Sequence, residues 1–214
     1  METLLLTKLQ ENTLQEIANI STGHAASSLA KLMDKKIKHN IPFVSVIQLE
    51  NIFDLIENPE EETYMIALEI NGDVNGVILM LMDEEGANLI SKYMTKKMIG
   101  EDIDKMTLEE QKELRFSVLV ECINIIGNSY ITTLTDITKL KIESGLTDIA
   151  IDMKAAVLDR AFLKAGATSY SDLIYIKSEL YLTDEKYINK NFIGEIVIVP
   201  NFEEKDRIME GVGI

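Results

Sequence analysis

The sequence carries one helical motif twice, and this repeat limits the possible folds more than any other feature. Glu16-Ile-Ala-Asn19-Ile recurs as Glu121-Cys-Ile-Asn124-Ile, 105 residues further along the chain. Residues 76–85 also align with residues 194–203: both segments have a glycine, then an apolar run, a polar residue and an acidic end at the same positions. Two copies of a helix-and-strand unit predict two halves that are related by a pseudo-two-fold axis.

The first half predicts a long helix, an extended segment, a hairpin and a shorter helix. These elements are expected over residues 4–37, 43–49, 64–82 and 84–97, respectively. Pro42 is expected to end the long helix, because a proline ring cannot continue it. Asn71-Gly72 supplies the positive φ angles that a tight hairpin turn requires. The unbroken apolar run 76–82 indicates a central strand that is covered on both faces.

The second half repeats this order. Helices are predicted over residues 108–140, 153–164 and 202–210, and strands over residues 173–182 and 192–199. We expect the two hairpins to join into one mainly antiparallel sheet covered by helices, which is an α+β fold. Residues 1–214 would then form a single domain, with repeat halves of about 1–100 and 101–214.

Within each long helix, the motif residues fall on one narrow stripe. At about 100° per residue, the stripe of the first helix is roughly 60° wide. It contains Asn12, Glu16, Asn19 and Gly23, and its counterpart contains Ser117, Glu121, Asn124 and Asn128. Apolar residues occupy the other side of both helices, so the stripes are predicted to face outward. Glycine inside an exposed helix costs about 1 kcal/mol relative to alanine, but it lets another protein's surface approach the backbone.

Glu and Asn three positions apart are often only solvated surface residues, and that explanation suffices for a single copy. Two equivalent stripes in halves that have otherwise diverged are harder to attribute to solvation. Inherited helix packing remains an alternative explanation for the repetition.

The motif resembles that of the CheC, CheX and FliY phosphatases of bacterial and archaeal chemotaxis. The family motif is Asp or Ser, three residues, Glu, two residues, Asn-Ile, two residues and Gly-x-Ala. The matching residues are Glu16, Asn19, Ile20, Gly23 and Ala25 in the first copy and Ser117, Glu121, Asn124 and Ile125 in the second. The sequence departs from the motif at Asn12 and at Asn128, where glycine stands one position early as Gly127. Two copies and a full second half are more similar to CheC than to CheX, and the additional switch domain of FliY is not expected.

The resemblance implies a phosphatase that removes the aspartyl phosphate of a CheY-type response regulator. Asn19 and Asn124 would position the hydrolytic water, because a carboxamide accepts from water and donates to phosphoryl oxygen without titrating. Glu16 and Glu121 would complete the catalytic pairs by docking against a regulator cation. Gly23 and Ser117 would lie in the same interface. No cofactor of the chain's own is expected, and Mg²⁺ is expected in the phosphorylated partner.

Two other functions stay open. The chain could be a non-catalytic adaptor that binds the response regulator, the receptor deamidase CheD, or both, or it could be a structural component of the flagellar motor. CheD is in any case a partner that the resemblance implies.

Composition excludes several classes of function. The net charge of −15 opposes binding to nucleic acid. No apolar run approaches the roughly 20 residues that cross a bilayer, and no signal-peptide pattern is present, so we expect a cytoplasmic protein without membrane insertion. The single cysteine, Cys122, excludes an internal disulfide and a cysteine metal cluster. It is predicted to be a core residue, and His24 is predicted to be structural.

Overall fold

The computed structural model describes residues 6–54, 56–100, 106–164, 166, 172–183, 190–201 and 204–214. The elements, in chain order, are α1 (Lys8–Met33), β1 (Lys36–His39), β2 (Phe43–Gln48), η1 (Leu49–Asp54), β3 (Glu62–Gly72), β4 (Gly76–Met82), α2 (Glu84–Ile99), α3 (Leu108–Thr138), β5 (Ile142–Met153), α4 (Lys154–Lys164), β6 (Asp172–Thr183), β7 (Lys190–Pro200) and α5 (Lys205–Gly211). Residues 202 and 203, with which the last predicted helix begins, lie outside the described residues.

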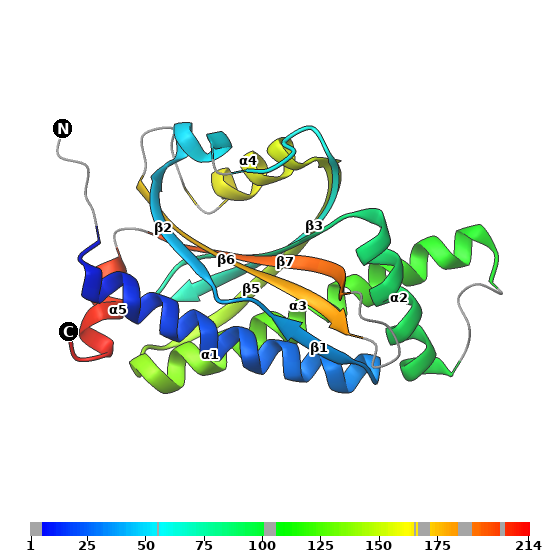
Figure 1. Cartoon of the computed structure of the whole chain (residues 1–214), viewed down its shortest axis with the longest axis horizontal. Coiled ribbons are helices and arrows are strands. Elements are labelled where there is room, and N and C mark those ends of the chain that lie inside the picture. The colour runs from blue at the N-terminus through cyan, green and yellow to red at the C-terminus, as the bar shows by residue number, and fades with distance from the viewer. Residues whose placement is uncertain are drawn as a thin grey trace.

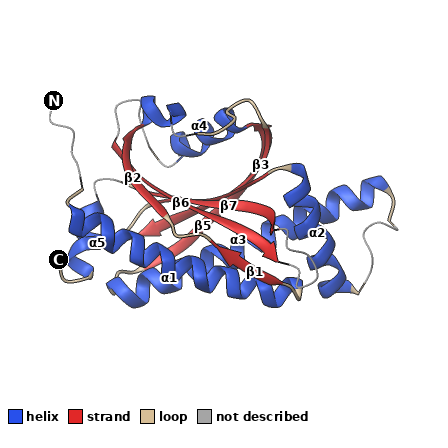
Figure 2. Cartoon of the chain, viewed as in Figure 1, coloured by secondary structure: helices blue, strands red, loops and turns tan. Residues whose placement is uncertain are grey.

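All strands of the described part of the chain belong to one seven-stranded sheet. Its order is β1-β6-β7-β4-β3-β5, with β2 paired to β6 beside β1, and every pairing is antiparallel. The sheet lies between α1 and α3 on one face and η1 and α4 on the other (Figures 1 and 2). The predicted α+β fold is therefore confirmed.

The sheet centre is as apolar as the sequence predicts. Every residue of β4 is buried, because side chains of α1 and α3 cover one face and side chains of α4 and η1 the other. One polar contact crosses the first of these layers. Thr22 of α1 donates to Ser178 of β6 at 3.0 Å and also contacts the Tyr130 hydroxyl of α3. This buried contact fixes both long helices against the sheet.

The two long helices begin and end with the same devices. Thr7 and Thr107 each form a capping box, with Gln10 and Glu110 as reciprocal partners. Asp34 and Lys139 end the helices in the left-handed conformation. These two C-caps are 105 residues apart, the same separation as that of the motif copies. The motifs therefore have the same register relative to the C-terminal ends of their helices.

The first helix is shorter than predicted. We expected it to continue to residue 37 and to stop at Pro42, but it ends at Met33 and Lys36–His39 forms β1. This prediction was wrong because pairing with β6 outweighs the weak helical pattern of these residues.

A complete strand was not predicted in the second half. Ile142–Met153 forms β5, the edge strand beside β3, and it is the counterpart of β1 and β2. The prediction of a tight turn at Asn71-Gly72 was also wrong, although the predicted hairpin is confirmed. Both residues extend β3 and pair with Glu143 and Ile142 of β5, so the chain turns only after Gly72.

Candidate functional site

The helices α1 and α3 pack side by side in antiparallel directions. His24 Nδ1 lies 3.0 Å from Thr133 Oγ1, and Ser28 Oγ lies 3.3 Å from Ser129 Oγ. A shift of 105 residues converts one contact into the other, so the pseudo-two-fold axis passes between them. His24 thus joins the two helices, in agreement with a structural role.

The same two contacts separate the motif copies. Because the helices run in opposite directions, extending this alignment along α1 places Asn19 beside about Thr138 of α3. Thr138 is fourteen positions from Asn124 on the same helix. At a rise of about 1.5 Å per residue, the two carboxamides are roughly 20 Å apart along the helices. The molecule therefore presents two separate motif surfaces, one toward each end of the helix pair.

The motif stripes lie at the surface, as the helical spacing predicts. Glu16, Glu121 and Ser117 are exposed, and Asn19, Asn124 and Gly23 are partly exposed. The apolar residues behind them are buried, among them Ile17 and Cys122. Burial, with a smaller contribution from the charge of Glu121, raises the pKa of the Cys122 thiol to about 12, so this cysteine stays protonated in the core.

The first surface combines the α1 stripe with the loop between β1 and β2. A Cβ atom on Gly23 would lie 3.6 Å from His39 Nε2, an ordinary contact, so the packing does not require glycine here. His39 Nδ1 lies 2.9 Å from the Asn40 carbonyl and must donate to it. Gln15 Nε2 donates to the Pro42 carbonyl at 2.8 Å. No pattern in the sequence indicates that His39 and Pro42 adjoin this stripe.

The second surface has a contact that reaches the motif asparagine. Thr147 Oγ1 of β5 donates to Asn124 Oδ1 at 3.3 Å, and both residues are partly exposed. Sequence reasoning missed Thr147, because β5 itself was not predicted.

The displaced glycine of the second copy has a packing role. A Cβ atom on Gly127 would approach Leu68 Cδ2 to 2.1 Å, so glycine allows α3 to lie close against β3. The residue at the position of Gly23 is Asn128, which is exposed. Gly127 therefore does not substitute for the motif glycine.

Each edge of the sheet has one extra residue beside the motif. In β5, Gly145 and Leu146 lie opposite Glu69 alone, since Ser144 pairs with Ile70 and Thr147 pairs with Leu68. On the other edge, residues 40–42 lie opposite residues 178–179. The two irregularities occupy equivalent places, because a shift of 105 residues maps residue 42 onto residue 147.

The edge irregularities also expose one apolar side chain each. Ile41 is 74% exposed and Leu146 is 75% exposed. These residues occupy equivalent positions, next to Pro42 and Thr147, respectively. Each motif surface thus consists of a polar helical stripe and a neighbouring exposed aliphatic residue on the sheet edge.

Comparison with known proteins gives a consistent result. The CheC-like family matches residues 9–46, which span most of α1 and continue into β2. The CheY-P phosphatase CheC of Bacillus subtilis (strain 168) is 24% identical over 205 residues, covering 95% of this chain and 94% of that protein. These matches support the resemblance of the chain to the CheC/FliY family. Thermotoga maritima FliY has the same fold, with a TM-score of 0.74 and 18% identity over 98% of both chains. The CheX-CheY-BeF3-Mg²⁺ complex of Borrelia burgdorferi matches with a TM-score of 0.52 and 19% identity, covering 86% of this chain and 96% of that one.

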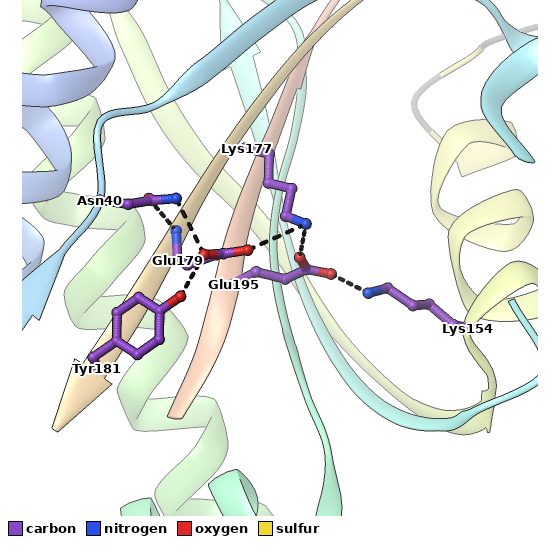
Figure 3. Close-up of polar contacts among 6 residues, drawn as sticks. All are labelled: Asn40, Lys154, Lys177, Glu179, Tyr181 and Glu195. Atoms are coloured by element: carbon purple, nitrogen blue, oxygen red, sulfur yellow. Dashed lines mark hydrogen bonds and ion pairs between the residues drawn. The ribbon is translucent and has the colours of Figure 1, made fainter. Parts of the chain in front are cut away.

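In this CheC/FliY-type fold, a buried ionic network lies on the sheet face opposite the motif helices (Figure 3). Glu195 is 3% exposed and its carboxylate lies 2.5 Å from Lys154 Nζ and 2.9 Å from Lys177 Nζ. Burial lowers the pKa of Lys177, but the hydrogen bond and the charge of Glu195 outweigh this effect and raise it. Lys177 is therefore charged, and the two ion pairs of Glu195 fix the start of α4 to β6 and β7.

The network continues to the irregular edge of the first motif surface. Lys177 Nζ lies 3.5 Å from Glu179, which accepts from Tyr181 at 2.5 Å and from the Asn40 side chain at 3.2 Å. The Asn40 side chain in turn accepts from the Glu179 backbone N–H at 2.8 Å. These contacts hold the chain at residue 40 against β6. The network contains no motif residue, and its geometry indicates a structural role.

No helix in the described ranges is long and apolar enough to cross a membrane. The same residues contain no group of three or more His, Cys, Asp or Glu side chains that could hold a metal ion.

Proposed function

We propose that this chain is a phosphatase that hydrolyses the aspartyl phosphate of a CheY-type response regulator. The observation that carries the proposal is the pair of surface stripes, each with an exposed glutamate one helical turn from a partly exposed asparagine. The similarity to a CheY-P phosphatase over 95% of the chain supports the reaction class. The similarity of the fold to CheX in a complex with CheY supports a CheY-like partner.

The chemistry requires little from the phosphatase. An aspartyl phosphate is an activated acyl phosphate, so hydrolysis needs a water molecule held in line with the phosphorus–oxygen bond that breaks. The oxygen of Asn19 or Asn124 accepts a hydrogen bond from that water, and the amide N–H groups donate to phosphoryl oxygen. The regulator supplies the Mg²⁺ that neutralises the phosphoryl charge, and no covalent intermediate with the phosphatase is needed.

The glutamates have a different task. Glu16 and Glu121 are exposed, and each can pair with a cation beside the phosphoaspartate of the regulator. Such a charge-assisted hydrogen bond contributes about 1.5–3 kcal/mol at an interface that excludes water. We therefore assign docking to the glutamates and water positioning to the asparagines.

The sheet edge extends the docking surface. Ile41 and Leu146 are the exposed apolar residues at the two edge irregularities, and each precedes a residue that contacts a motif helix, Pro42 and Thr147 respectively. An interface with a buried aliphatic residue beside a charged pair is a common arrangement in protein complexes. We propose that each residue contacts the regulator when its site is occupied.

The test compares the Asn19→Ala, Asn124→Ala double variant with the wild-type protein. Phosphorylated regulator is mixed with catalytic amounts of each protein, and its decay is followed. Loss of the positioned water should reduce the rate by about 100-fold or more, while binding to the regulator changes little. Normal turnover by the double variant would refute the assignment.

The adaptor function predicts another result in the same assay. A CheC-like adaptor would protect the phosphorylated regulator only at stoichiometric concentrations, and catalytic amounts of it would not accelerate the decay. Binding to CheD is a separate proposal that follows from the family, and a pull-down with purified CheD tests it.

A further inference from the structure

The hydrogen bond between Thr147 and Asn124 distinguishes the two motif surfaces. The Thr147 hydroxyl donates at 3.3 Å to the Asn124 oxygen, so the carboxamide oxygen is directed toward β5. A carbonyl oxygen has a second lone pair, and both amide hydrogens remain on the other side of the group. The bond therefore restricts the rotation of the carboxamide while leaving acceptor and donor capacity for water and phosphate.

The extra residue in β5 makes this contact possible. Side chains alternate between the faces of a regular strand, so Ser144 and Thr147 would point to opposite faces. Instead, Ser144 and Thr147 lie on the same face, because their partners Ile70 and Leu68 both belong to the core on the side of α1 and α3. The bulge therefore turns Thr147 toward α3, which is a known effect of bulges beside functional sites.

The first surface lacks this contact. The residue equivalent to Thr147 is Pro42, which has no hydroxyl, and its carbonyl accepts from Gln15 instead. Within the described ranges, no hydrogen bond to the Asn19 side chain is present, whereas Asn124 has one. The two copies thus differ in how firmly the motif asparagine is held.

We propose that Thr147 is a positioning residue that orients the Asn124 carboxamide for catalysis, so that the second site is preorganised and the first is not. This inference rests on the proposed function, because it assumes that Asn124 positions the hydrolytic water. Fixing one side-chain rotamer in advance corresponds to about a threefold to tenfold gain in rate. The gain should appear in kcat, since Thr147 acts on the orientation of Asn124 and not on docking.

The experiment uses the full chain with Asn19→Ala, so that only the second site acts. Into this background we would introduce Thr147→Val, which removes the hydroxyl at constant shape, and Thr147→Ser, which restores it. The matched control is Thr183→Val on β6, where the lost hydroxyl donates to the Lys36 carbonyl. Thermal unfolding of each variant identifies any loss of folding.

The expected result is a fall in kcat of about threefold to tenfold for Thr147→Val, with KM unchanged. Thr147→Ser should recover most of the rate, and Thr183→Val should keep all of it. The side-chain amide NMR signals of Asn124 should shift in Thr147→Val and return in Thr147→Ser.

Each contrary result has one meaning. If the Asn19→Ala, Asn124→Ala variant is inactive while Thr147→Val is as fast as its parent, the positioning role is wrong and the proposed function stands. If removal of both asparagines leaves full activity, the assignment of water positioning to the asparagines is wrong, and the inference about Thr147 fails with it. If the wild-type protein does not accelerate the decay of the phosphorylated regulator, the proposed function itself is wrong. If Asn19→Ala alone abolishes turnover, Asn124 has no catalytic role, and the inference about Thr147 is refuted with it.

Discussion

Replacing Gly23 and Gly127 by alanine should change stability in opposite directions, although both glycines lie inside long helices. Alanine favours a helix over glycine by about 0.5–1 kcal/mol, because it has less backbone freedom to lose. At Gly23 the new Cβ would meet only His39 Nε2 at 3.6 Å. The helical gain should therefore be retained, and Gly23→Ala should stabilise the protein by about 0.5–1 kcal/mol.

At Gly127 the same substitution meets the core. Its Cβ would lie 2.1 Å from Leu68 Cδ2, 3.4 Å from Cγ and 3.8 Å from Cβ of the same side chain. Leu68 can rotate, but it is 1% exposed and its neighbours must then move as well. Overpacking of this kind costs about 1–3 kcal/mol. After the helical gain is subtracted, Gly127→Ala should destabilise the protein by about 1–2 kcal/mol.

Urea unfolding of the two variants and the wild-type protein measures both effects. The midpoints should shift to higher urea for Gly23→Ala and to lower urea for Gly127→Ala, with equal slopes. If Gly127→Ala were as stable as Gly23→Ala, the close packing of α3 on β3 would not be the reason for Gly127. In the phosphatase assay, Gly23→Ala should raise KM for the regulator in an Asn124→Ala background, because the methyl group lies on the docking surface.

Three further predictions concern pH, the ionic network and the sheet edge. Burial raises the pKa of Cys122 from 9.0 and that of Tyr130 from 10.0, each to about 12. The stability that these two buried neutral groups contribute is complete below pH 9 and is lost as the pH rises to 12, because both groups ionise at lower pH in the unfolded chain than in the folded protein. The free energy of unfolding measured in urea should therefore decline less steeply with pH in Cys122→Ala than in the wild-type protein. Glu195→Gln leaves Lys154 and Lys177 without their buried ion-pair partner and should lower the free energy of unfolding by about 3 kcal/mol, whereas an unchanged value would show that the network contributes nothing. Leu146→Ala in an Asn19→Ala background should raise KM about tenfold, because the interface loses about 1–2 kcal/mol of apolar burial. Ile41→Ala in the same background is the control, and it should leave KM unchanged.

The regular parts of the fold could be predicted because their patterns are strong. Both long helices and both hairpins follow from periodicity, and Asp83 caps α2 by accepting from the Gly86 backbone N–H, as its position before an acidic segment indicates. The edge strands could not be recognised in the same way. The short β1 reads as the end of a helix, and β5 has an irregular pattern of burial, because it pairs on one side only and is interrupted by its bulge.

The site was predictable only as far as a single helix determines it. A spacing of three and four residues places Glu16, Asn19 and Gly23 on one stripe without knowledge of the fold. The contact of Thr147 with Asn124 depends instead on a strand that joins the sheet edge and on one extra residue within it. A bulge of this kind has no reliable sequence signature, so the residue beside the asparagine could not be inferred from spacing.

The distance between the motif surfaces explains why they were able to diverge. Since the two carboxamides lie roughly 20 Å apart along antiparallel helices, they cannot act together on one phosphoryl group. If the proposed function holds, each surface would therefore meet its regulator independently, and a change at one would leave the chemistry of the other intact. The two copies differ in this way at two places: Pro42 is equivalent to Thr147 at the sheet edges, and Gly23 is equivalent to Asn128 on the stripes. Two halves related by a pseudo-two-fold axis thus present two motif surfaces that share the Glu and Asn pair, while their asparagines are held differently.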